Sequence, residues 1–347
     1  MIRTVAIPST VRIKPGALAR AGIYLARDGL RQVSLMVSEG LPATIGETFR
    51  AGCDEAAVEV VQETCAVSAD FDEARRLLAG LPPRCEAVVG LGGGRALDVA
   101  KYVAHLANLP YFAVPTSLSN DAFCSPQASL VLDGRRRSLH ARLPRAVVVD
   151  TDVCLRAPDV LWWSGVGDLV AKITAVADWK LAFHAVGTAV DDLAALLSDA
   201  TVYQFIARPA RDTDGMRLLG TALMLNGIAM EISGSSRPAS GSEHLISHAL
   251  DRLGGRPRPH GMQVGVASYL VALLQGEGAE RIDRVFQVTG FWDGAAADPF
   301  DRDEWLRAVD LAPQLKDRFY TVLSSRDCRP EVERHLRDDP RLSRCIV

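Results

Sequence analysis

The first 150 residues alternate short β-branched stretches with amphipathic stretches. Between the strand candidates, the stretches at residues 16–29, 68–81 and 95–108 carry apolar side chains at helical spacing. The strand candidates are residues 10–13, 32–37, 56–63, 86–92, 111–115 and 146–150. Successive strands joined by helices form βαβ units, because parallel strands need a crossover connection. The sequence therefore predicts an α/β domain built around a mostly parallel sheet.

The pattern changes after about residue 155. Residues 167–184, 212–233, 243–253 and 261–276 have the 3.6-residue period of helices, and strand candidates are few. A chain of 347 residues also exceeds what one hydrophobic core usually serves. We therefore expect two domains, an α/β domain over 1–155 and an all-helical domain over 156–347. Closely packed domains leave a cleft between them, where ligands usually bind.

Composition narrows the class of protein. The chain is 48% hydrophobic and 23% charged, which is typical of a soluble globular protein, and its net charge of −3 provides no basic surface for nucleic acid. No uninterrupted apolar run approaches the ~18 residues of a membrane span. The opening "MIRTVAIPST" lacks the apolar core of a leader peptide, so the expected location is the cytoplasm. Seven scattered cysteines without a C-x-x-C pair argue against disulfides and a thiolate zinc site.

A glycine-rich turn separates a strand candidate from a helix candidate in "AVVGLGGGRALDVAKYVA". Gly92, Gly93 and Gly94 would let the backbone approach a phosphate, whose charge the following helix N-terminus attracts. Arg95 stands where G-x-G-x-x-G requires its third glycine, and the G-K-[ST] ending of a P-loop is absent. The stretch predicts a phosphate-binding turn, with an ordinary tight turn as the alternative.

A second polar loop, "VPTSLSNDAFCSPQAS", follows the next strand candidate. Loops often collect Ser, Thr, Asn and Pro for their turn chemistry alone. Two polar loops at successive strand ends are more informative, because nucleotides bind outside the carboxyl ends of parallel strands. A basic run at residues 135–137, "RRR", fits a solvated hairpin turn, with a contact to an anionic substrate as the alternative.

Three of the seven histidines gather in one short segment. His244 and His248 are four residues apart, so both rings point from one helix face. This is the spacing of metalloprotease helices, but Leu245 replaces the catalytic glutamate. His260 follows a Pro- and Gly-rich turn that can fold it back onto this helix. A catalytic zinc site takes three N or O ligands, so two of these histidines and the Asp168 carboxylate would suffice, although Asp168 could instead be a helix cap or first-turn acid.

The ordered motifs together closely resemble the sn-glycerol-1-phosphate dehydrogenases, within the iron-containing alcohol dehydrogenase and dehydroquinate synthase superfamily. The motifs are "GGGRALDVAK", "PTSLSNDAFCSPQASL", "GVGDLVAKITAVADWKLA", "SRPASGSEHLISHALD" and "HGMQVGV". The resemblance runs from "KPGAL" near the start to "KDRFYTVL" near the end. It implies a metal-dependent, NAD(P)-linked enzyme of phospholipid metabolism that interconverts dihydroxyacetone phosphate and sn-glycerol 1-phosphate, or a related polyol phosphate. A divalent metal, usually Zn²⁺, and a homo-oligomer are also implied.

The resemblance assigns roles to individual residues. Asp168, His244 and His260 would hold the metal, and Asp121 and His248 would contact the substrate as catalytic groups beside Asp168. Residues 1–155 would bind NAD(H) or NADP(H), and the helical domain would bind metal and substrate. The cofactor contacts would be Gly92, Gly93, Gly94, Arg95, Asp98, Thr116, Ser117, Leu118, Ser119 and Ser125.

Two further residues are candidates for the substrate phosphate. A guanidinium grips phosphate through two parallel hydrogen bonds, which favours Arg237 in "SGSSRPAS", and Lys172 could assist from one turn after Asp168. Ordinary surface or capping roles are the alternative for both.

Two positions bear on specificity. Met262 stands where the family commonly has the glutamate of H-G-E, and loss of a group that orients a metal ligand can alter metal affinity or substrate preference. Glu39 follows a strand candidate, where a carboxylate can accept hydrogen bonds from the adenine ribose and repel a 2′-phosphate. Glu39 therefore favours NAD(H) over NADP(H), with an exposed turn residue as the alternative.

Two other functions use the same scaffold. A carbocycle-forming enzyme like dehydroquinate synthase would use NAD and metal without releasing reduced cofactor. Asp168 in place of the glutamate of those synthases, and the absence of a "GHTFGHA"-type run, argue against it. A non-catalytic, ligand-sensing relative would keep the fold and lose the activity. Turnover of NADH separates these alternatives from a dehydrogenase.

Overall fold

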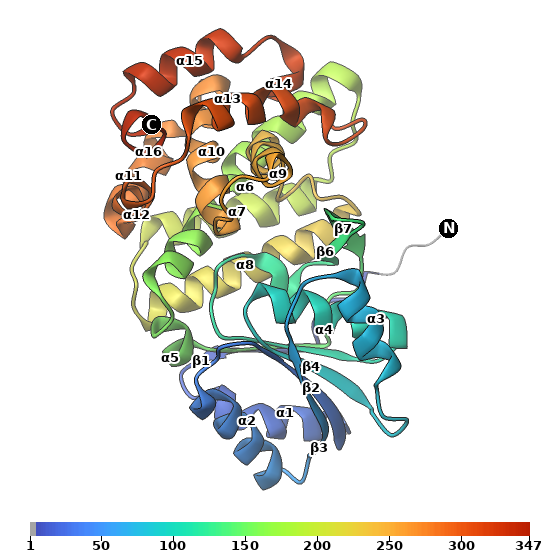
Figure 1. Cartoon of the computed structure of the whole chain (residues 1–347). Coiled ribbons are helices and arrows are strands. Elements are labelled where there is room, and N and C mark those ends of the chain that lie inside the picture. The colour runs from blue at the N-terminus through green and yellow to red at the C-terminus, as the bar shows by residue number, and fades with distance from the viewer. Residues whose placement is uncertain (1–4) are drawn as a thin grey trace. The chain divides into compact units, whose positions relative to one another are not determined.

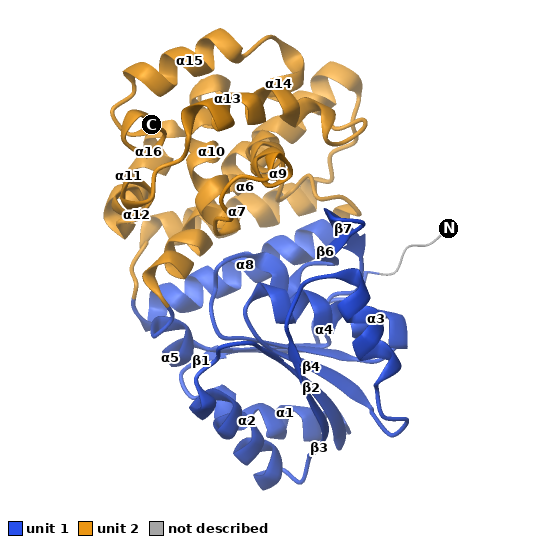
Figure 2. Cartoon of the chain, viewed as in Figure 1, with its two compact units in different colours: residues 1–157, 212–231 blue, residues 158–211, 232–347 orange. Residues whose placement is uncertain are grey.

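The computed structural model describes residues 5–347. The first four residues of "MIRTVAIPST", on which the expectation of no leader peptide partly rests, lie outside this range. The chain forms two compact units, coloured separately in Figure 2. Unit 1 comprises the residues up to Ala157 together with Asp212–Glu231, and unit 2 comprises Pro158–Arg211 and Ile232–Val347. The domain boundary between residues 155 and 156 stays a prediction. The compact units differ from it in one respect, because the helical residues 212–231 belong to the unit that contains the α/β part.

A six-stranded sheet forms the centre of unit 1. Its order is β1-β8-β5-β4-β2-β3, and every neighbouring pair is parallel. The strands are β1 (Thr10–Lys14), β2 (Gln32–Ser38), β3 (Glu59–Ala66), β4 (Ala87–Gly92), β5 (Tyr111–Pro115) and β8 (Ala146–Asp150). The predicted parallel sheet and its strands are confirmed. Gly92 pairs with Pro115, so β4 and β5 end side by side.

Helices cover both faces of this sheet (Figure 1). Leu35 and Val89 point to one face, where they share a buried core with Phe49. Gly90 faces the opposite side, where its Cα approaches Ala100 so closely that an added Cβ would lie 3.0 Å from the Ala100 Cβ. The first face carries η1 (Leu18–Arg20), α1 (Ala21–Arg27) and α2 (Ala43–Glu55), and the second carries α3 (Phe71–Ala79) and α4 (Gly94–Ala107). Helix α2 is an addition to the predicted elements.

The rest of unit 1 is a hairpin and three helical segments. Strands β6 (Gln127–Leu132) and β7 (Arg135–His140) pair antiparallel through a turn at Asp133 and Gly134, both at positive φ. The basic run at 135–137 is exposed, but it begins β7 directly after the turn, so the prediction that it forms the turn of the hairpin itself was wrong. The helical segments are η2 (Asp121–Cys124), α5 (Thr151–Leu155) and α8 (Thr213–Ser233). An added Cβ at Gly227 of α8 would lie 1.7 Å from the Cys124 carbonyl oxygen, so a glycine is required for this packing.

Unit 2 is helical, as predicted. Its long helices are α6 (Asp159–Val186), α7 (Asp192–Ala207), α9 (Ser242–Leu253) and α10 (His260–Gln275). The remainder is α11 (Ala279–Thr289), α12 (Phe291–Ala297), α13 (Arg302–Leu311), η3 (Ala312–Gln314), α14 (Val322–Ser325), α15 (Arg329–Asp338) and α16 (Leu342–Cys345). Helix α6 is long and apolar enough to cross a membrane, but 72% of its most apolar 18-residue window is buried, as in the core helix of a soluble protein.

A buried carboxylate on α6 joins the ends of three other helices. Asp178 is fully buried, and its oxygens accept hydrogen bonds from the backbone N–H of Ser242 (2.7 Å) and of Val322 (2.8 Å). The Gln275 side-chain amide donates a third bond at 3.0 Å. Burial, reinforced by the nearby negative charge of Glu243, raises the pKa of Asp178 from 3.8 to about 6. The folded protein therefore retains a proton on Asp178 that the unfolded chain releases.

This shift predicts a pH dependence of the stability of unit 2. Between pH 4 and pH 6 the folded state binds more protons at Asp178, so rising pH destabilises it by up to about 3 kcal/mol in total. The difference in unfolding free energy between wild type and Asp178→Asn should shrink over this range. All five tryptophans lie in unit 2, so their fluorescence during urea unfolding follows this transition. Asp303→Asn, at an exposed position, is the control; parallel pH curves for wild type and Asp178→Asn would contradict the assignment.

Candidate functional site

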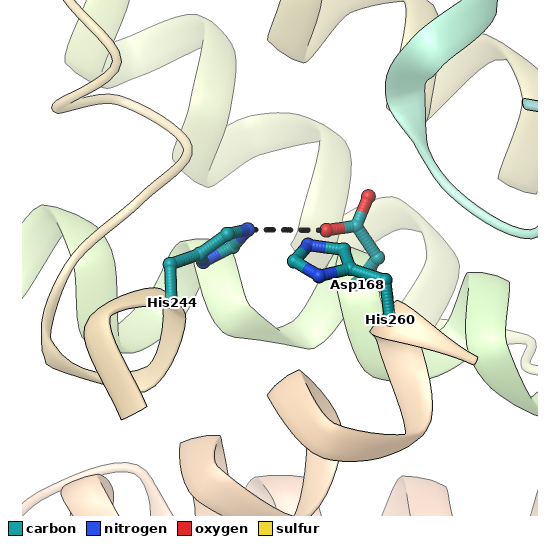
Figure 3. A group of neighbouring side chains, drawn as sticks. All are labelled: Asp168, His244 and His260. Atoms are coloured by element: carbon teal, nitrogen blue, oxygen red, sulfur yellow. Dashed lines mark ion pairs between the residues drawn. The ribbon is translucent and has the colours of Figure 1, made fainter. Parts of the chain in front are cut away.

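Asp168, His244 and His260 come together in unit 2 from three helices (Figure 3). Each offers one ligand atom, and these atoms all lie within 4.8 Å of one another. His244 Nε2 is 3.4 Å from Asp168 Oδ1. Asp168 and His244 are buried and His260 is half-buried. The structure thus assembles the three predicted metal ligands into one cluster.

Asp168 lies in the interior of α6, which begins at Asp159. The alternative of a helix cap or first-turn acid is therefore wrong, because neither the orphan N–H groups nor the dipole of the helix start reaches this position. Asp168 is 1% exposed. A carboxylate buried this deeply in a helix core requires compensating charge.

Glycines bring the backbones of α6 and α10 into contact beside the ligands. A Cβ added at Gly167 would lie 2.0 Å from the Gly261 carbonyl oxygen, and one added at Gly261 would lie 1.8 Å from the Ser164 carbonyl oxygen. Gly167 immediately precedes Asp168, and Gly261 immediately follows His260. The same close approach that packs the helices therefore places these two ligands together.

The hydrogen bonds of both histidines fit metal binding. His244 Nδ1 is 2.9 Å from Glu243 Oε1, and His260 Nδ1 is 3.1 Å from Ser247 Oγ. In a neutral imidazole, an Nδ1–H bonded to an oxygen leaves the Nε2 lone pair available to a metal ion, and His244 Nε2 is the atom that lies nearest to Asp168. Two imidazole nitrogens and one carboxylate oxygen are a donor set typical of a catalytic zinc with an open position. The residues present therefore fit a divalent metal.

Lys172 compensates the charge of Asp168. It is fully buried, and its Nζ lies 3.1 Å from Asp168 Oδ1. Burial by itself would raise the pKa of Asp168, but Lys172 and His244 together hold that pKa below its usual range. Burial would likewise lower the pKa of His244, but its bonds to Asp168 and Glu243 raise it above the ordinary value. The carboxylate is thus kept ionised, as a metal ligand must be.

His248 lies beside the cluster. Its ring centroid is 6.4 Å from that of His244 and 6.0 Å from that of His260. His248 is half-buried, and it follows His244 by one helical turn on α9. A substrate group bound at the cluster would therefore be close to a second titratable ring.

The two predicted phosphate contacts occupy different surroundings. Lys172 is committed to Asp168, as described above. Arg237 is 3% exposed, and its guanidinium lies 3.7 Å from the centroid of the Phe319 ring while Nη1 donates to the Tyr320 carbonyl oxygen. Lys316 Nζ lies 3.9 Å from the centroid of the same ring. A phosphate role for Lys172 or Arg237 stays a prediction.

The predicted cofactor residues of unit 1 follow three neighbouring strands. Glu39 comes directly after β2, Gly92 ends β4, and Thr116 follows β5. The Thr116 N–H donates to the Gly92 carbonyl oxygen at 3.0 Å, and the Gly93 N–H donates to Ser38 Oγ at 3.0 Å. Strand order reverses between β2 and β4, which is the position where α/β sheets bind nucleotides.

The glycine turn has room for a ligand. Gly92 has φ +146°, and an added Cβ would lie 2.1 Å from Ser38 Oγ, so only glycine fits there. At Gly93 an added Cβ would meet no described atom within 4 Å. Gly93 also precedes the first residue of α4, whose N-terminal N–H groups attract a phosphate. This arrangement fits the phosphate-binding turn predicted from the sequence.

The remaining predicted cofactor residues are less uniform. Arg95 is exposed, with Nη1 3.9 Å from Glu39 Oε2. Asp98 is buried and bonded to Lys101 Nζ at 2.9 Å, and Leu118 is buried beside Gly220 of α8. Asp121 opens η2. Gly94 is the first residue of α4, and Ser117, Ser119 and Ser125 lie in the segments on either side of η2. The cofactor and substrate roles of all these residues stay predictions.

Comparison with known proteins identifies the family. Residues 12–158 match the family described as iron-containing alcohol dehydrogenase. A protein of Aeropyrum pernix named glycerol-1-phosphate dehydrogenase (NAD(P)+) is 33% identical over 337 residues, covering 94% of this chain and 94% of that protein. The chain belongs to the glycerol-1-phosphate dehydrogenase family. A family member of the same name from Thermofilum pendens is 38% identical over 323 residues, covering 91% and 92%.

The fold is also that of this wider group of enzymes. The crystal structure of glycerol dehydrogenase from Schizosaccharomyces pombe matches 99% of this chain and 91% of that one, with a TM-score of 0.78 and 18% identity. The predicted resemblance is confirmed, and the two relatives are named as dehydrogenases, not as synthases.

Position 262 does not orient His260. Met262 is 5% exposed within α10, and His260 Nδ1 faces Ser247 on α9 instead. Ser247 in turn contacts Gln263 (2.7 Å, Oγ to Oε1). The glutamate expected from the glycerol-1-phosphate dehydrogenase family is therefore not needed to hold this ring.

Three further residues, Glu243, Ser247 and Gln263, support the ligands and were not predicted from the sequence. Glu243 precedes a predicted ligand in "SGSEH", but a neighbour in sequence usually points elsewhere on a helix. Its burial to 0% exposure is a tertiary property. The one signal in the sequence was a glutamate directly before a predicted ligand, at the start of a predicted helix.

Substitution at the glycine contact should disrupt the ligand cluster. Gly261→Ala forces the start of α10 away from α6, which should separate His260 from Asp168 and weaken Zn²⁺ binding. Overpacking should also cost about 1–3 kcal/mol of stability, despite the better helix propensity of alanine.

Zinc affinity by chelator competition and thermal unfolding measure both effects. Gly46→Ala is the matched control, since its added Cβ would meet only the flexible Arg50 guanidinium, at 3.1 Å. Wild-type zinc affinity in Gly261→Ala would show that the glycine contact does not set the ligand geometry.

Proposed function

We propose that this protein is a metal-dependent, NAD(P)-linked dehydrogenase that interconverts dihydroxyacetone phosphate and sn-glycerol 1-phosphate by hydride transfer. The observation that carries the proposal is the cluster of Asp168, His244 and His260, assembled in a member of the glycerol-1-phosphate dehydrogenase family. We further propose Zn²⁺ as the metal, the cytoplasm as the location and a homo-oligomer as the working form.

Unit 2 would hold the metal through Asp168 Oδ and the Nε2 atoms of His244 and His260. A divalent ion bound there supplies a Lewis acid for the oxygen on C2 of the substrate. Asp168 and Glu243 both carry carboxylates next to His244, and the buried Lys172 ammonium pairs with Asp168. The partly exposed His260 leaves one side of the cluster open to a small ligand.

His248 is the proposed proton-transfer group. The centroid of its ring lies 6.4 Å from that of His244 and 6.0 Å from that of His260, and His248 does not belong to the ligand group. Carbonyl reduction requires a proton at the C2 oxygen, and alcohol oxidation releases one. His248 would donate that proton in one direction and accept it in the other. Asp121 is retained as a proposed substrate contact.

Unit 1 would hold the cofactor at the ends of β2, β4 and β5. The nicotinamide supplies or accepts the hydride. The backbone N–H groups after Gly93 would bind the cofactor phosphates, and Glu39 would accept hydrogen bonds from the adenine ribose. For the substrate phosphate we retain Arg237, whose guanidinium and the Lys316 ammonium concentrate positive charge at Phe319.

The direct test is an activity measurement. NADH absorbance should fall on addition of dihydroxyacetone phosphate, the oxidation should stop after chelation and return with Zn²⁺, and the product should be the sn-1 isomer. NADH that binds without being consumed would contradict the substrate assignment. Transient use of NADH without net oxidation would instead indicate a synthase.

A double substitution tests the metal site separately from the substrate. His244→Ala/His260→Ala should lose bound metal and activity while retaining NADH binding, because all the residues proposed to bind the cofactor lie in unit 1. His184→Ala, at an exposed position near the end of α6, is the control and should retain both metal and activity. Activity in the double variant would refute the ligand assignment.

Glu39 predicts the choice between cofactors. Glu39→Ala should raise the preference for NADPH over NADH by about 10-fold in kcat/KM, equivalent to ~1.4 kcal/mol. The substitution removes the charge that repels a 2′-phosphate and frees Arg95, which pairs with Glu39 at 3.9 Å. Glu47→Ala, at an exposed position of α2, is the control. An unchanged NADPH-to-NADH ratio would assign Glu39 to an ordinary exposed turn.

A further inference from the structure

The two histidine ligands are held by chemically different partners. Behind His244 stands a carboxylate, that of Glu243, with Oε1 2.9 Å from Nδ1. Behind His260 stands a neutral hydroxyl, that of Ser247, at 3.1 Å from Nδ1. Glu243 and Ser247 are both fully buried on α9. Solvent therefore does not screen the difference between the charged partner of His244 and the neutral partner of His260.

The Glu243 carboxylate is itself fixed. Its Oε1 also accepts the Gly241 N–H at 2.6 Å, and its Oε2 accepts the Thr174 hydroxyl at 2.8 Å. Thr174 lies on α6, the helix that carries Asp168. Glu243 therefore ties the ring of His244 to the same helix that provides the carboxylate ligand.

The partner of His260 has a defined proton direction. Gln263 Oε1 can only accept, so the Ser247 hydroxyl donates to it at 2.7 Å and its oxygen is left to accept from His260 Nδ1–H. Gln263 Nε2 then donates to Asp251 Oδ1 at 3.3 Å. This series of hydrogen bonds orients the His260 ring, but the group that contacts the ring, the Ser247 hydroxyl, is uncharged.

We propose that Glu243 is the positioning residue that sets metal affinity in this protein, by fixing the ring of His244 and placing a negative charge behind it. The proposal rests on the metal site of the proposed function. A carboxylate behind a ligating imidazole fixes its tautomer and increases its basicity, and such charge-assisted bonds are about twice as strong as neutral ones. Ser247 has the same orienting role at His260 with a smaller effect.

Two substitutions can separate the negative charge of Glu243 from the hydrogen bonds by which it anchors the His244 ring. In Glu243→Gln the side-chain oxygen can keep its bonds to Gly241 and His244, while the amide nitrogen donates to Thr174 Oγ1. Thr174 can then direct its own proton to the Ala171 carbonyl oxygen, 3.0 Å away. Glu243→Gln thus removes mainly the charge, and Glu243→Ala removes charge and anchor together.

The experiment measures Zn²⁺ affinity by competition with a chromophoric chelator, without substrate or NADH. Loss of an outer partner typically weakens metal binding by ~10–100-fold. We expect about 10-fold for Glu243→Gln, about 100-fold for Glu243→Ala, and for Ser247→Ala a loss smaller than either. The visible spectrum of the Co²⁺ form should shift most in Glu243→Ala, because the His244 ring is no longer held.

A purely structural role is tested in the same variants. Glu243 lies in the first turn of α9, where an acid also stabilises the helix dipole. Asp178→Asn is the matched control, because Asp178 is a buried carboxylate that bonds the Ser242 N–H at the same helix start but contacts neither histidine. Asp178→Asn should lower thermal stability, but it should change Zn²⁺ affinity and the Co²⁺ spectrum much less than the Glu243 variants do.

Several outcomes would overturn the proposal. The assigned role is excluded if Glu243→Ala lowers Zn²⁺ affinity by less than ~10-fold relative to wild type. It is also excluded if Glu243→Ala lowers Zn²⁺ affinity less than Ser247→Ala does. If Glu243→Ala does not fold, Glu243→Gln decides, and wild-type affinity in that variant overturns the charge argument. Wild-type protein that binds no Zn²⁺ overturns both this proposal and the metal site. Tight Zn²⁺ binding with the expected order of variants, but no reduction of dihydroxyacetone phosphate, upholds this inference and refutes only the proposed substrate.

Discussion

The close contact between α6 and α10 is the constraint on which the candidate metal centre depends. A side chain at Gly167 or Gly261 would collide with backbone of the facing helix, and each glycine adjoins a ligand in sequence. Helix packing and ligand geometry are consequently one requirement. The helices cannot separate to relieve local strain without also separating Asp168 from His260.

Buried charge is the second organising feature of unit 2. Asp168, Asp178 and Glu243 are each essentially inaccessible to water. Each is satisfied differently: Asp168 by Lys172, Glu243 by N–H, O–H and imidazole groups, and Asp178 by backbone N–H groups at two helix starts. Burying an ionised group without such partners would cost several kcal/mol. The carboxylates therefore connect α6 to α9, α10 and α14, and two of them, Asp168 and Glu243, also contact His244 of the cluster.

Unit 1 places its polar groups by topology. Three adjacent parallel strands, β5, β4 and β2, end at the same edge, so loops distant in sequence become neighbours there. The Gly92 backbone is bent at a φ that other residues rarely adopt, and the Ser38 hydroxyl fills the space where a Cβ would stand. The neighbouring Gly93 has open space where a Cβ would stand, which leaves room for a ligand at the turn.

Much of the fold could be predicted from the sequence. Period-2 and period-3.6 patterns located the strands and the long helices, because burial on one face imposes them locally. Helix α2 was not recognised, and the fold grouped α8 with unit 1, since its packing against Cys124 is a contact between distant segments. For the site, the spacing of His244 and His248 predicted a shared helix face, and the family resemblance supplied the set of ligands.

The sequence by itself determined most of the strands and long helices and the glycine turn, because these follow from local periodicity and residue chemistry, and its resemblance to a family indicated which clustered residues are the ligands. Tertiary structure alone decided that Asp168 lies inside a helix and not at its start, that Lys172 neutralises it, and that Glu243 and Ser247 stand behind the two histidines. These features depend on which buried groups face one another across helices. No local pattern encodes such contacts, since burial and partner choice arise only when the helices pack.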